Sequence, residues 1–149
     1  MPQDYSGFEY FNVTFPAEYV VQVEFDRPKK LNAFTEQMFW SLGSIFNRIS
    51  HDTDIRAVVL TGNGDRAFTA GLDVSAASET GAISRSGNED PARRATMLRR
   101  HILEMQEPIT AIEKCEKPVI VVMHGISYGL AIDVSSSCDV RICTKDTRF

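Results

Sequence analysis

The sequence predicts an α/β fold in which strands of a parallel sheet alternate with helices. Three short runs of apolar and β-branched residues, at 19–25, 56–62 and 117–125, have the length and composition of strands. Between them lie two longer stretches, 36–50 and 90–112, whose apolar residues recur at helical spacing. Strands that alternate with helices are joined by right-handed crossovers, so this order indicates an α/β chain.

Length and composition indicate a single globular domain. The chain has 149 residues, of which 43% are hydrophobic and 24% are charged. Its 16 Lys and Arg residues against 20 Asp and Glu give a net charge of -4, which argues against a general nucleic-acid binder. No apolar run approaches the roughly 18 residues of a membrane span. The N-terminus lacks the pattern of a secretory signal and that of a transit peptide.

The first strand and the first helix have the clearest patterns. The segment 19–25 alternates apolar and polar residues, which predicts a half-buried strand. Thr35 occupies the N-cap position of a helix predicted over 36–50, and Glu36 places a negative charge in its first turn. The apolar stripe that this helix should bury consists of Met38, Phe39, Leu42, Ile45, Phe46 and Ile49.

The middle of the chain should form a second strand, a loop and a second helix. The run 56–62 is continuously apolar and ends in glycine, which suits a strand buried on both faces of a parallel sheet. Residues 75–90 are small and polar, so we expect a mobile loop that can hold one short helical turn. Asp90 and Pro91 then start a helix, and Pro108 should kink or split it. Its apolar stripe consists of Leu98, Ile102, Met105, Ile109 and Ile112.

The last third of the chain predicts a strand, a short helix and a further strand. These elements cover 117–125, 128–139 and 140–145. The cysteines at 115, 138 and 143 are odd in number and widely spread, so we expect reduced thiols that are mostly buried. The three histidines are too scattered to indicate a metal site, and no metal is expected.

Small residues follow two of the predicted strands. The strand at 56–62 leads into Ala-Gly-Leu-Asp at 70–73, and the next strand leads into Gly-Leu-Ala at 129–131, with Asp133 just beyond. Ligand sites of α/β folds gather at the carboxyl ends of strands. Two backbone N–H groups that point into a common space at such an edge would form an oxyanion hole.

Each of these residues also has a structural explanation. Gly71 can simply supply a positive φ for a turn, and Gly129 and Ala131 can simply let a helix pack tightly. Asp73 suits a capping or turn position. Asp133, in contrast, lies inside an apolar helix, where an unpaired carboxylate is costly, so a functional role is favoured for it.

Three segments together resemble a known family. They are "DRPKKLNAF", "AFTAGLDV" and "KPVIVVMHGISYGLAIDVSSSCDVRICTKDTRF". In this order and spacing they resemble the enoyl-CoA hydratase/isomerase family, also called the crotonase superfamily, over about residues 10–149. The resemblance implies a ClpP/crotonase-type spiral of β-β-α units that assembles as a homotrimer or homohexamer. Family members are normally longer, so we expect residues 1–149 to be the N-terminal part of a single domain without its C-terminal helices.

The resemblance also assigns roles to residues. The amide of Leu72 matches one oxyanion-hole donor of the family, and the amide of Leu130 matches the other, although the family usually has glycine there. A leucine side chain at that position would narrow the space beside a thioester. The residues that would line an acyl-CoA site are Ala33, Ala70, Gly71, Leu72, Asp73, Val74, Gly129 and Leu130.

Asp133 decides the subfamily that the sequence resembles. Hydratases of the family carry glutamate at this position and dienoyl-CoA isomerases carry aspartate, so the chain is most similar to a Δ3,5-Δ2,4-dienoyl-CoA isomerase of fatty-acid β-oxidation. Such an enzyme needs no metal or redox cofactor, because CoA is part of the substrate, and it works in peroxisomes or mitochondria. The family's distal proton-transfer carboxylates would follow Phe149, so we expect the 149-residue chain alone to be weakly stable and inactive.

Two alternatives to this activity remain open. One is a hydratase or another crotonase-type acyl-CoA enzyme with the same fold. The other is a truncated, non-catalytic protein that only binds acyl-CoA, which is what missing distal carboxylates would produce.

Overall fold

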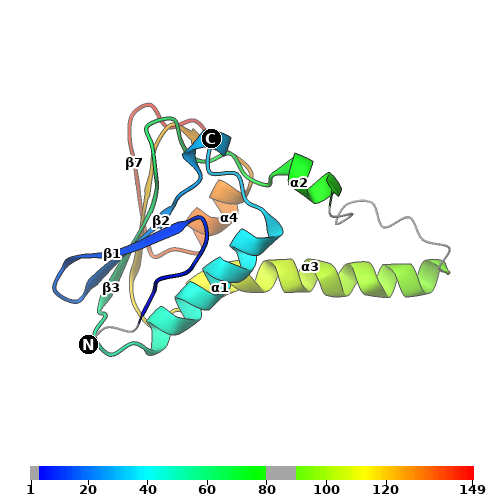
Figure 1. Ribbon diagram of the computed structural model, residues 1–149, viewed down its shortest axis with the longest axis horizontal. Helices are drawn as coiled ribbons and strands as arrows, with labels where there is room; N and C mark the ends of the chain where they lie inside the picture. The colour runs from blue at the N-terminus through cyan, green and yellow to red at the C-terminus, as the bar shows by residue number, and fades with distance from the viewer. Residues whose placement is uncertain (1–3, 80–89) are drawn as a thin grey trace.

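The computed structural model describes residues 4–79 and 90–149 and consists of two sheets with helices packed against them (Figure 1). The strands are β1 (Phe11–Ala17), β2 (Val20–Phe25), β3 (Ala57–Gly62), β4 (Ala67–Thr69), β5 (Val119–Met123), β6 (Ile126–Ser127) and β7 (Val140–Cys143). The helices are the 3-10 turn η1 (Pro28–Lys30), α1 (Glu36–His51), α2 (Val74–Glu79), α3 (Pro91–Glu113) and α4 (Leu130–Ser136).

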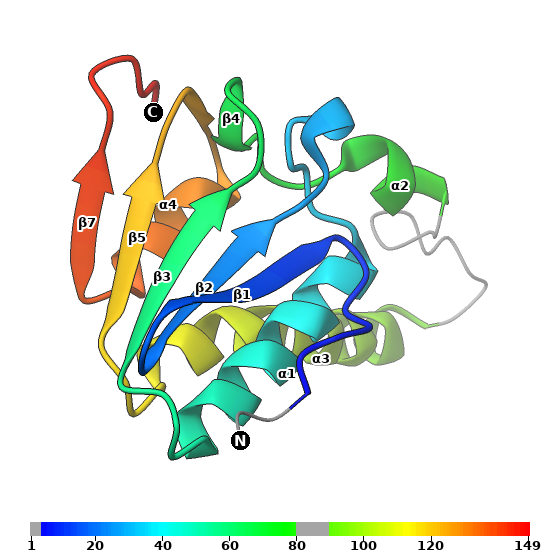
Figure 2. The ribbon, with the colours of Figure 1, turned by 60° about the vertical axis from the view of Figure 1, so that its left-hand side comes forward.

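The large sheet has five strands in the order β1-β2-β3-β5-β7, as Figure 2 shows. The strands β2, β3, β5 and β7 are parallel to one another, and β1 forms an antiparallel hairpin with β2. The small sheet pairs β4 with β6, and isolated bridges join Phe34 to Leu72 and Ile126 to Arg148. Each turn of the chain therefore passes from the large sheet to the small one and then to a helix. This is the predicted spiral of β-β-α units.

The core lies between the large sheet and α1. Val21, Val23 and Phe25 of β2 are fully buried, as their alternation predicts. The whole predicted stripe of α1 is buried against them, and the Oγ1 atom of Thr35 accepts a hydrogen bond from the Met38 amide at 3.4 Å, which confirms the N-cap. Burial of each such large apolar side chain contributes about 1.5–3 kcal/mol, so this face anchors the fold.

Burial of β3 departs from the prediction. Val58 and Leu60 are fully buried, but the alternating residues Ala57, Val59 and Thr61 are only half-buried, so the strand is not covered on both faces. The reason is that the helices gather on one side of the large sheet, where α1 and α3 lie behind the strands in Figure 2. The strands β1, β4 and β6 were not predicted. With three and two residues, β4 and β6 are too short to show a period.

Helix α3 begins as predicted and is not split by Pro108. The Oδ1 atom of Asp90 accepts a hydrogen bond from the Ala92 amide at 2.9 Å and caps the helix. Pro108 packs on Gly43 of α1, where an added Cβ would lie 3.2 Å from the proline Cα atom. The two helices therefore cross at a glycine that lets them approach closely.

The predicted stripe of α3 is buried at Ile112 and only partly buried at Met105 and Ile109. Ile112 is 1% exposed, whereas Leu98 is 53% and Ile102 is 46% exposed, so the prediction is wrong for the first half. In Figure 1 the first half extends beyond the rest of the molecule, past the end of α1. On the opposite side, β7 forms an edge of the large sheet and exposes about half of Val140 and Ile142.

The cysteines also differ from the prediction. Cys138 is buried, and burial raises the pKa of its thiol to about 12. Cys115 is half-buried, but Cys143 is exposed, so only part of the set is buried as expected. No helix within residues 4–79 and 90–149 is long and apolar enough to cross a bilayer. Of the predicted loop 75–90, α2 takes up the first residues, and positions 80–89 lie outside the described residues.

Candidate active site at the carboxyl ends of β3 and β5

Segments that follow β2, β3 and β5 meet at one edge of the large sheet. The Ala70 amide donates a hydrogen bond to the Leu31 carbonyl at 2.9 Å, which joins the segment after β3 to the turn after β2. The Tyr128 amide donates to the Thr69 carbonyl at 3.1 Å, which joins the segment after β5 to β4. The two stretches of small residues are thus brought together, as predicted for the carboxyl ends of parallel strands.

The amide of Leu72 is left unbonded by a parallel bridge. The Phe34 amide donates to the Gly71 carbonyl at 2.8 Å, and the Asp73 amide donates to the Phe34 carbonyl at 2.8 Å. These bonds use the groups on either side of Leu72, so its own N–H points away from Phe34. Within residues 4–79 and 90–149 this N–H has no hydrogen-bond acceptor. It is available to bind a ligand atom.

The amide of Leu130 is unbonded for a different reason. Leu130 is the first residue of α4, and the first amides of a helix lack an intrahelical acceptor. The next two are satisfied, because Ala131 donates to the Tyr128 carbonyl at 3.1 Å and Ile132 donates to the Gly129 carbonyl at 2.9 Å. The Leu130 N–H has no acceptor in the described part of the chain.

Gly71 lies against the turn that carries the Leu130 amide. Its φ is +95°, and a Cβ atom added there would lie 3.1 Å from the Tyr128 carbonyl oxygen and 3.6 Å from the Leu130 nitrogen. Gly71 therefore supplies the positive φ that was predicted for it. It also allows the close approach of the Tyr128 turn, which a side chain would hinder. Since Leu72 follows directly, the structure brings the segments that carry the two unbonded amides into contact.

Gly129 and Ala131 fit the second turn for separate reasons. Gly129 has a φ of +55°, and an added Cβ would lie 4.0 Å from Gly71, so backbone conformation and not space requires glycine there. Ala131 is a fully buried residue of α4, which supports the explanation that its small side chain lets the helix pack closely. The Leu130 side chain is half-buried and packs against the hydrophobic core.

Asp133 is exposed, which corrects the argument that favoured a role for it. That argument assumed a buried, unpaired carboxylate, but the side chain lies at the surface of α4. The prediction that the Asp133 carboxylate is buried at a free-energy cost is therefore wrong. Asp133 lies in the first turn of α4, three positions after Leu130, whose amide is unbonded.

Asp73 is a cap, as predicted, and also half of an ion pair that the sequence did not indicate. Its Oδ1 atom accepts a hydrogen bond from the Ala76 amide at 3.1 Å and caps α2. Its Oδ2 atom lies 2.7 Å from Nη1 of Arg27. The Arg27 guanidinium, and after it the Ala76 amide, hold the pKa of the Asp73 carboxyl below its usual value.

The remaining predicted residues lie around this edge at different depths. Ala33 and Ala70 are half-buried, and the carbonyl of Ala33 accepts a hydrogen bond from Arg27 at 2.9 Å. Leu72 and Val74 are 40% and 63% exposed, so the edge of the site presents apolar side chains at the surface. An exposed apolar rim suits an apolar ligand such as an acyl chain.

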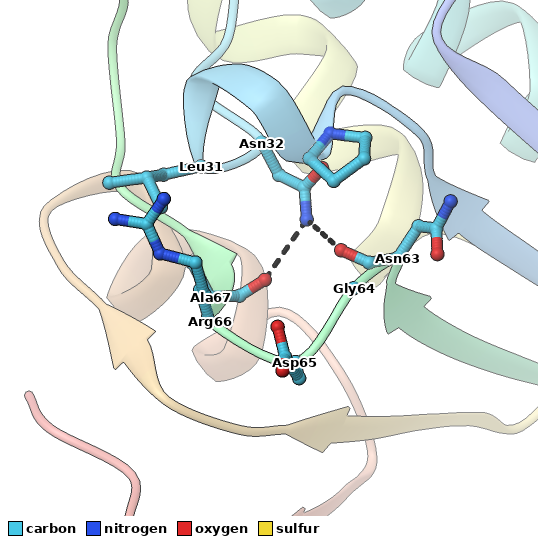
Figure 3. A pocket seen from close by; sticks show the side chains of 8 residues that line it. Leu31, Asn32, Asn63, Gly64, Asp65, Arg66 and Ala67 are labelled. Atoms are coloured by element: carbon cyan, nitrogen blue, oxygen red, sulfur yellow. Dashed lines mark hydrogen bonds between the residues drawn. The ribbon is translucent and has the colours of Figure 1, made fainter.

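A small hollow beside the site is built around Asn32 (Figure 3). Asn32 is fully buried, and its Nδ2 atom donates to the carbonyls of Asn63 and Ala67, both at 3.0 Å. Its Oδ1 atom accepts a hydrogen bond from the Arg27 amide at 2.9 Å. The Asn32 side chain therefore joins the turn after β2 to the loop after β3, which is a structural role.

Sequence reasoning missed both Arg27 and Asn32. Arg27 occurs in the segment "DRPKKLNAF", but the sequence gives it no role, and its partner Asp73 lies 46 positions away. No local pattern carries such a pairing, because it depends on how β2 and β3 pair. Among residues 4–79 and 90–149, no group of three or more His, Cys, Asp or Glu side chains gathers as metal ligands would.

Comparison with known proteins identifies the family. The model of the enoyl-CoA hydratase/isomerase family matches residues 20–149. The chain belongs to the enoyl-CoA hydratase/isomerase family. The crotonase fold of this family is also found in a solved structure described as a putative enoyl-CoA hydratase from Streptomyces coelicolor. It superposes with a TM-score of 0.79 and 27% identity over 97% of this chain and 49% of that one.

Two curated relatives of this enoyl-CoA hydratase/isomerase chain share one name. The mitochondrial Δ3,5-Δ2,4-dienoyl-CoA isomerase of Mus musculus is 40% identical over 144 residues, which is 96% of this chain and 43% of the relative. The peroxisomal Δ3,5-Δ2,4-dienoyl-CoA isomerase of Arabidopsis thaliana is 37% identical over 124 residues, which is 83% of this chain and 44% of the relative. The chain thus spans less than half the length of both curated relatives.

Proposed function

We propose that the complete gene product isomerises 3,5-dienoyl-CoA to 2,4-dienoyl-CoA in fatty-acid β-oxidation. The observation that carries the proposal is the contact between two segments that each present an unbonded main-chain amide, at Leu72 and Leu130. The names of the mouse and Arabidopsis relatives support the choice of reaction. Aspartate at 133, where hydratases that the chain resembles carry glutamate, supports it further.

The amides of Leu72 and Leu130 would donate hydrogen bonds to the thioester oxygen. Removal of a proton from C2 of the 3,5-dienoyl chain leaves a negative charge that spreads from the thioester oxygen to C6. Return of one proton at C6 gives the 2,4-diene, so the formula of the substrate does not change. Donors fixed at the oxygen stabilise this charge as it develops, and one such donor is typically worth about 2.7–4 kcal/mol of barrier.

Asp133 would act on the acyl chain beside this oxygen. Its carboxylate is exposed in the first turn of α4, three positions after Leu130, so we expect a ligand held by the Leu130 amide to lie near it. Proton transfer needs no metal or redox cofactor, and CoA enters as part of the substrate. The segments that would line the acyl-CoA site also contain Ala33, Ala70, Gly71, Asp73, Val74 and Gly129.

A hydratase is the second candidate, because the Streptomyces structure is described as a putative enoyl-CoA hydratase. Hydration requires two carboxylates that act on water, and aspartate is one methylene shorter than glutamate. A substrate placed for a glutamate would be out of reach of Asp133. Direct comparison of 2-enoyl-CoA hydration with 3,5-dienoyl-CoA isomerisation by the same preparation separates the two reactions.

The test uses the purified complete gene product and the Asp133→Asn variant. Isomerisation is followed by the ultraviolet absorbance of the conjugated 2,4-dienoyl thioester, and acyl-CoA binding is followed by calorimetry. We expect the variant to lose at least about 100-fold in kcat while binding stays within about threefold. An unchanged rate would leave Asp133 with a structural role only. Binding of acyl-CoA without turnover by the wild type would support the non-catalytic alternative.

Assembly and compartment follow from the same proposal. A homotrimer or homohexamer would give the exposed apolar residues Leu98 and Ile102 of α3 a place to be buried. The relatives' names support a mitochondrial or peroxisomal location. The 149-residue chain alone should be weakly stable and inactive, and rapid turnover of 3,5-dienoyl-CoA by it would contradict this.

A further inference from the structure

We propose that Arg27 is a positioning residue that holds the Leu72 amide in place for the thioester oxygen. The inference rests on the proposed function, because it concerns an oxyanion-hole donor. Arg27 does not touch the unbonded amides themselves. It acts by forming hydrogen bonds to both backbone segments that meet in the bridge between Phe34 and Leu72.

One nitrogen of Arg27 joins both sides of this bridge. Nη1 donates to the Ala33 carbonyl at 2.9 Å and to Oδ2 of Asp73 at 2.7 Å. Ala33 directly precedes Phe34, which is the partner of Leu72 in the bridge, and Asp73 directly follows Leu72. The guanidinium thus contacts both segments of the bridge, one residue away from the amide that it would position.

Arg27 is itself fixed by its surroundings. Its side chain is 17% exposed, and that of Asp73 is 12% exposed. Its backbone amide donates to Oδ1 of Asn32 at 2.9 Å, and its guanidinium carbon lies 5.4 Å from the centre of the Tyr10 ring. A charged group that is largely buried and held at both ends moves little, so it can fix the position of the backbone that it contacts.

The contacts of Arg27 exceed what α2 needs for its own stability. Oδ1 of Asp73 caps the helix by accepting a hydrogen bond from the Ala76 amide, so the cap survives without the arginine. The two bonds between Phe34 and its neighbours across the bridge, both 2.8 Å, also remain when Arg27 is removed. Loss of Arg27 should therefore loosen the 70–73 segment by a fraction of an ångström and leave the fold intact.

A purely structural ion pair would behave differently from a positioning residue. If Arg27 only stabilises the fold, its replacement lowers the unfolding temperature and leaves the kinetics of the folded enzyme unchanged. If it positions the Leu72 amide, replacement lowers kcat and weakens polarisation of the bound thioester, while KM changes little. The amide is a donor whose effect is strongest in the transition state.

The experiment compares Arg27→Met and Arg27→Lys in the complete gene product with a matched control, Arg56→Met. Arg56 stacks on the Tyr19 ring at 3.9 Å and precedes β3, at the opposite end of the strand from the site. Measurements are kcat and KM for 3,5-dienoyl-CoA and the absorption maximum of bound 4-dimethylaminocinnamoyl-CoA. The absorption of this conjugated thioester moves to longer wavelength when hydrogen bonds polarise its carbonyl group.

For Arg27→Met we expect kcat to fall about 10- to 100-fold, because loss of a complete donor costs about 10²- to 10³-fold and this donor is only displaced. KM should stay within about threefold, and the red shift of the chromophore should shrink. Arg27→Lys should give intermediate values, because an ammonium cannot reproduce the contacts of a guanidinium to both acceptors. Arg56→Met should match the wild type in kcat and in the red shift.

Wild-type kcat and red shift in folded Arg27→Met would overturn the proposal, as would equal losses in Arg56→Met. If Arg27→Met does not fold, Arg27→Lys decides, and wild-type values for that variant overturn the proposal. A wild type that shifts the chromophore but does not isomerise the dienoyl-CoA contradicts the proposed function alone, and the red shift still tests Arg27. A wild type that does not bind the chromophore overturns both.

Discussion

Replacement of Gly71 by alanine should impair the site through two separable effects. At a φ of +95° an alanine is strained by about 1–2 kcal/mol, which lowers the free energy of unfolding by that amount. The added Cβ would also lie 3.1 Å from the Tyr128 carbonyl oxygen, so one segment must shift by a few tenths of an ångström. We expect that shift to move the Leu72 amide relative to the Leu130 amide.

The two effects can be separated with a matched control. Gly7 has a similar φ of +87°, and an added Cβ there meets nothing within 4 Å. Urea unfolding should show similar losses of about 1–2 kcal/mol for Gly71→Ala and Gly7→Ala, with an additional loss for Gly71→Ala from the contact. Only Gly71→Ala should lose isomerase activity, by about 10-fold, since displacement by 1 Å can cost about 10²-fold.

The kinetic comparison can refute the reasoning. If folded Gly71→Ala has the same kcat as Gly7→Ala, the close approach of the two segments has no part in catalysis. If the two variants lose equal stability, the contact with the Tyr128 carbonyl is relieved without cost. The first result would leave Gly71 as a residue that is needed only for its backbone conformation, and the second would refute only the predicted extra loss of stability.

Three further predictions concern stability and solubility. The lowered pKa of Asp73 stabilises the fold above the pKa of the unfolded carboxyl, and this stabilisation is lost as the pH falls below about 4. In urea unfolding, Asp73→Asn should therefore reduce the difference in the free energy of unfolding between pH 7 and pH 3, and an unchanged difference would contradict this. Asn32→Ala should cost about 2–4 kcal/mol in urea unfolding, because it leaves buried backbone groups without partners, and a loss below 1 kcal/mol would contradict the role assigned to Asn32. Lysine at both Leu98 and Ile102 should reduce light scattering by the 149-residue chain without lowering its unfolding temperature, and unchanged scattering would show that this surface does not drive association.

The elements with strong local patterns were predicted most reliably. Helix α1 was predicted to within one residue, because Thr35 and the apolar stripe mark its start and its buried face within the sequence. The parallel strands β2, β3 and β5 were also found. The short strands β4 and β6 were not, because their pairing depends on contacts between segments far apart in the chain.

The site was predicted in its backbone and less well in its side chains. The small residues near Gly71 and Gly129 predicted that two segments would approach closely, and they do. The burial assumed for Asp133 was wrong, because a seven-residue helix at the surface covers only one of its faces. Arg27 was missed, since an ion pair between the segments that follow β2 and β4 depends on tertiary packing and leaves no trace in local composition.

The unbonded amide at Leu72 has a consequence for how such a site can vary. A donor supplied by the main chain is retained whichever side chain the residue carries, and proline alone among the usual amino acids removes it. Position 72 is therefore open to selection for the fit of different acyl groups while the hydrogen bond persists. A library of all substitutions there should show broad tolerance of turnover, altered preference among chain lengths and one sharp exception.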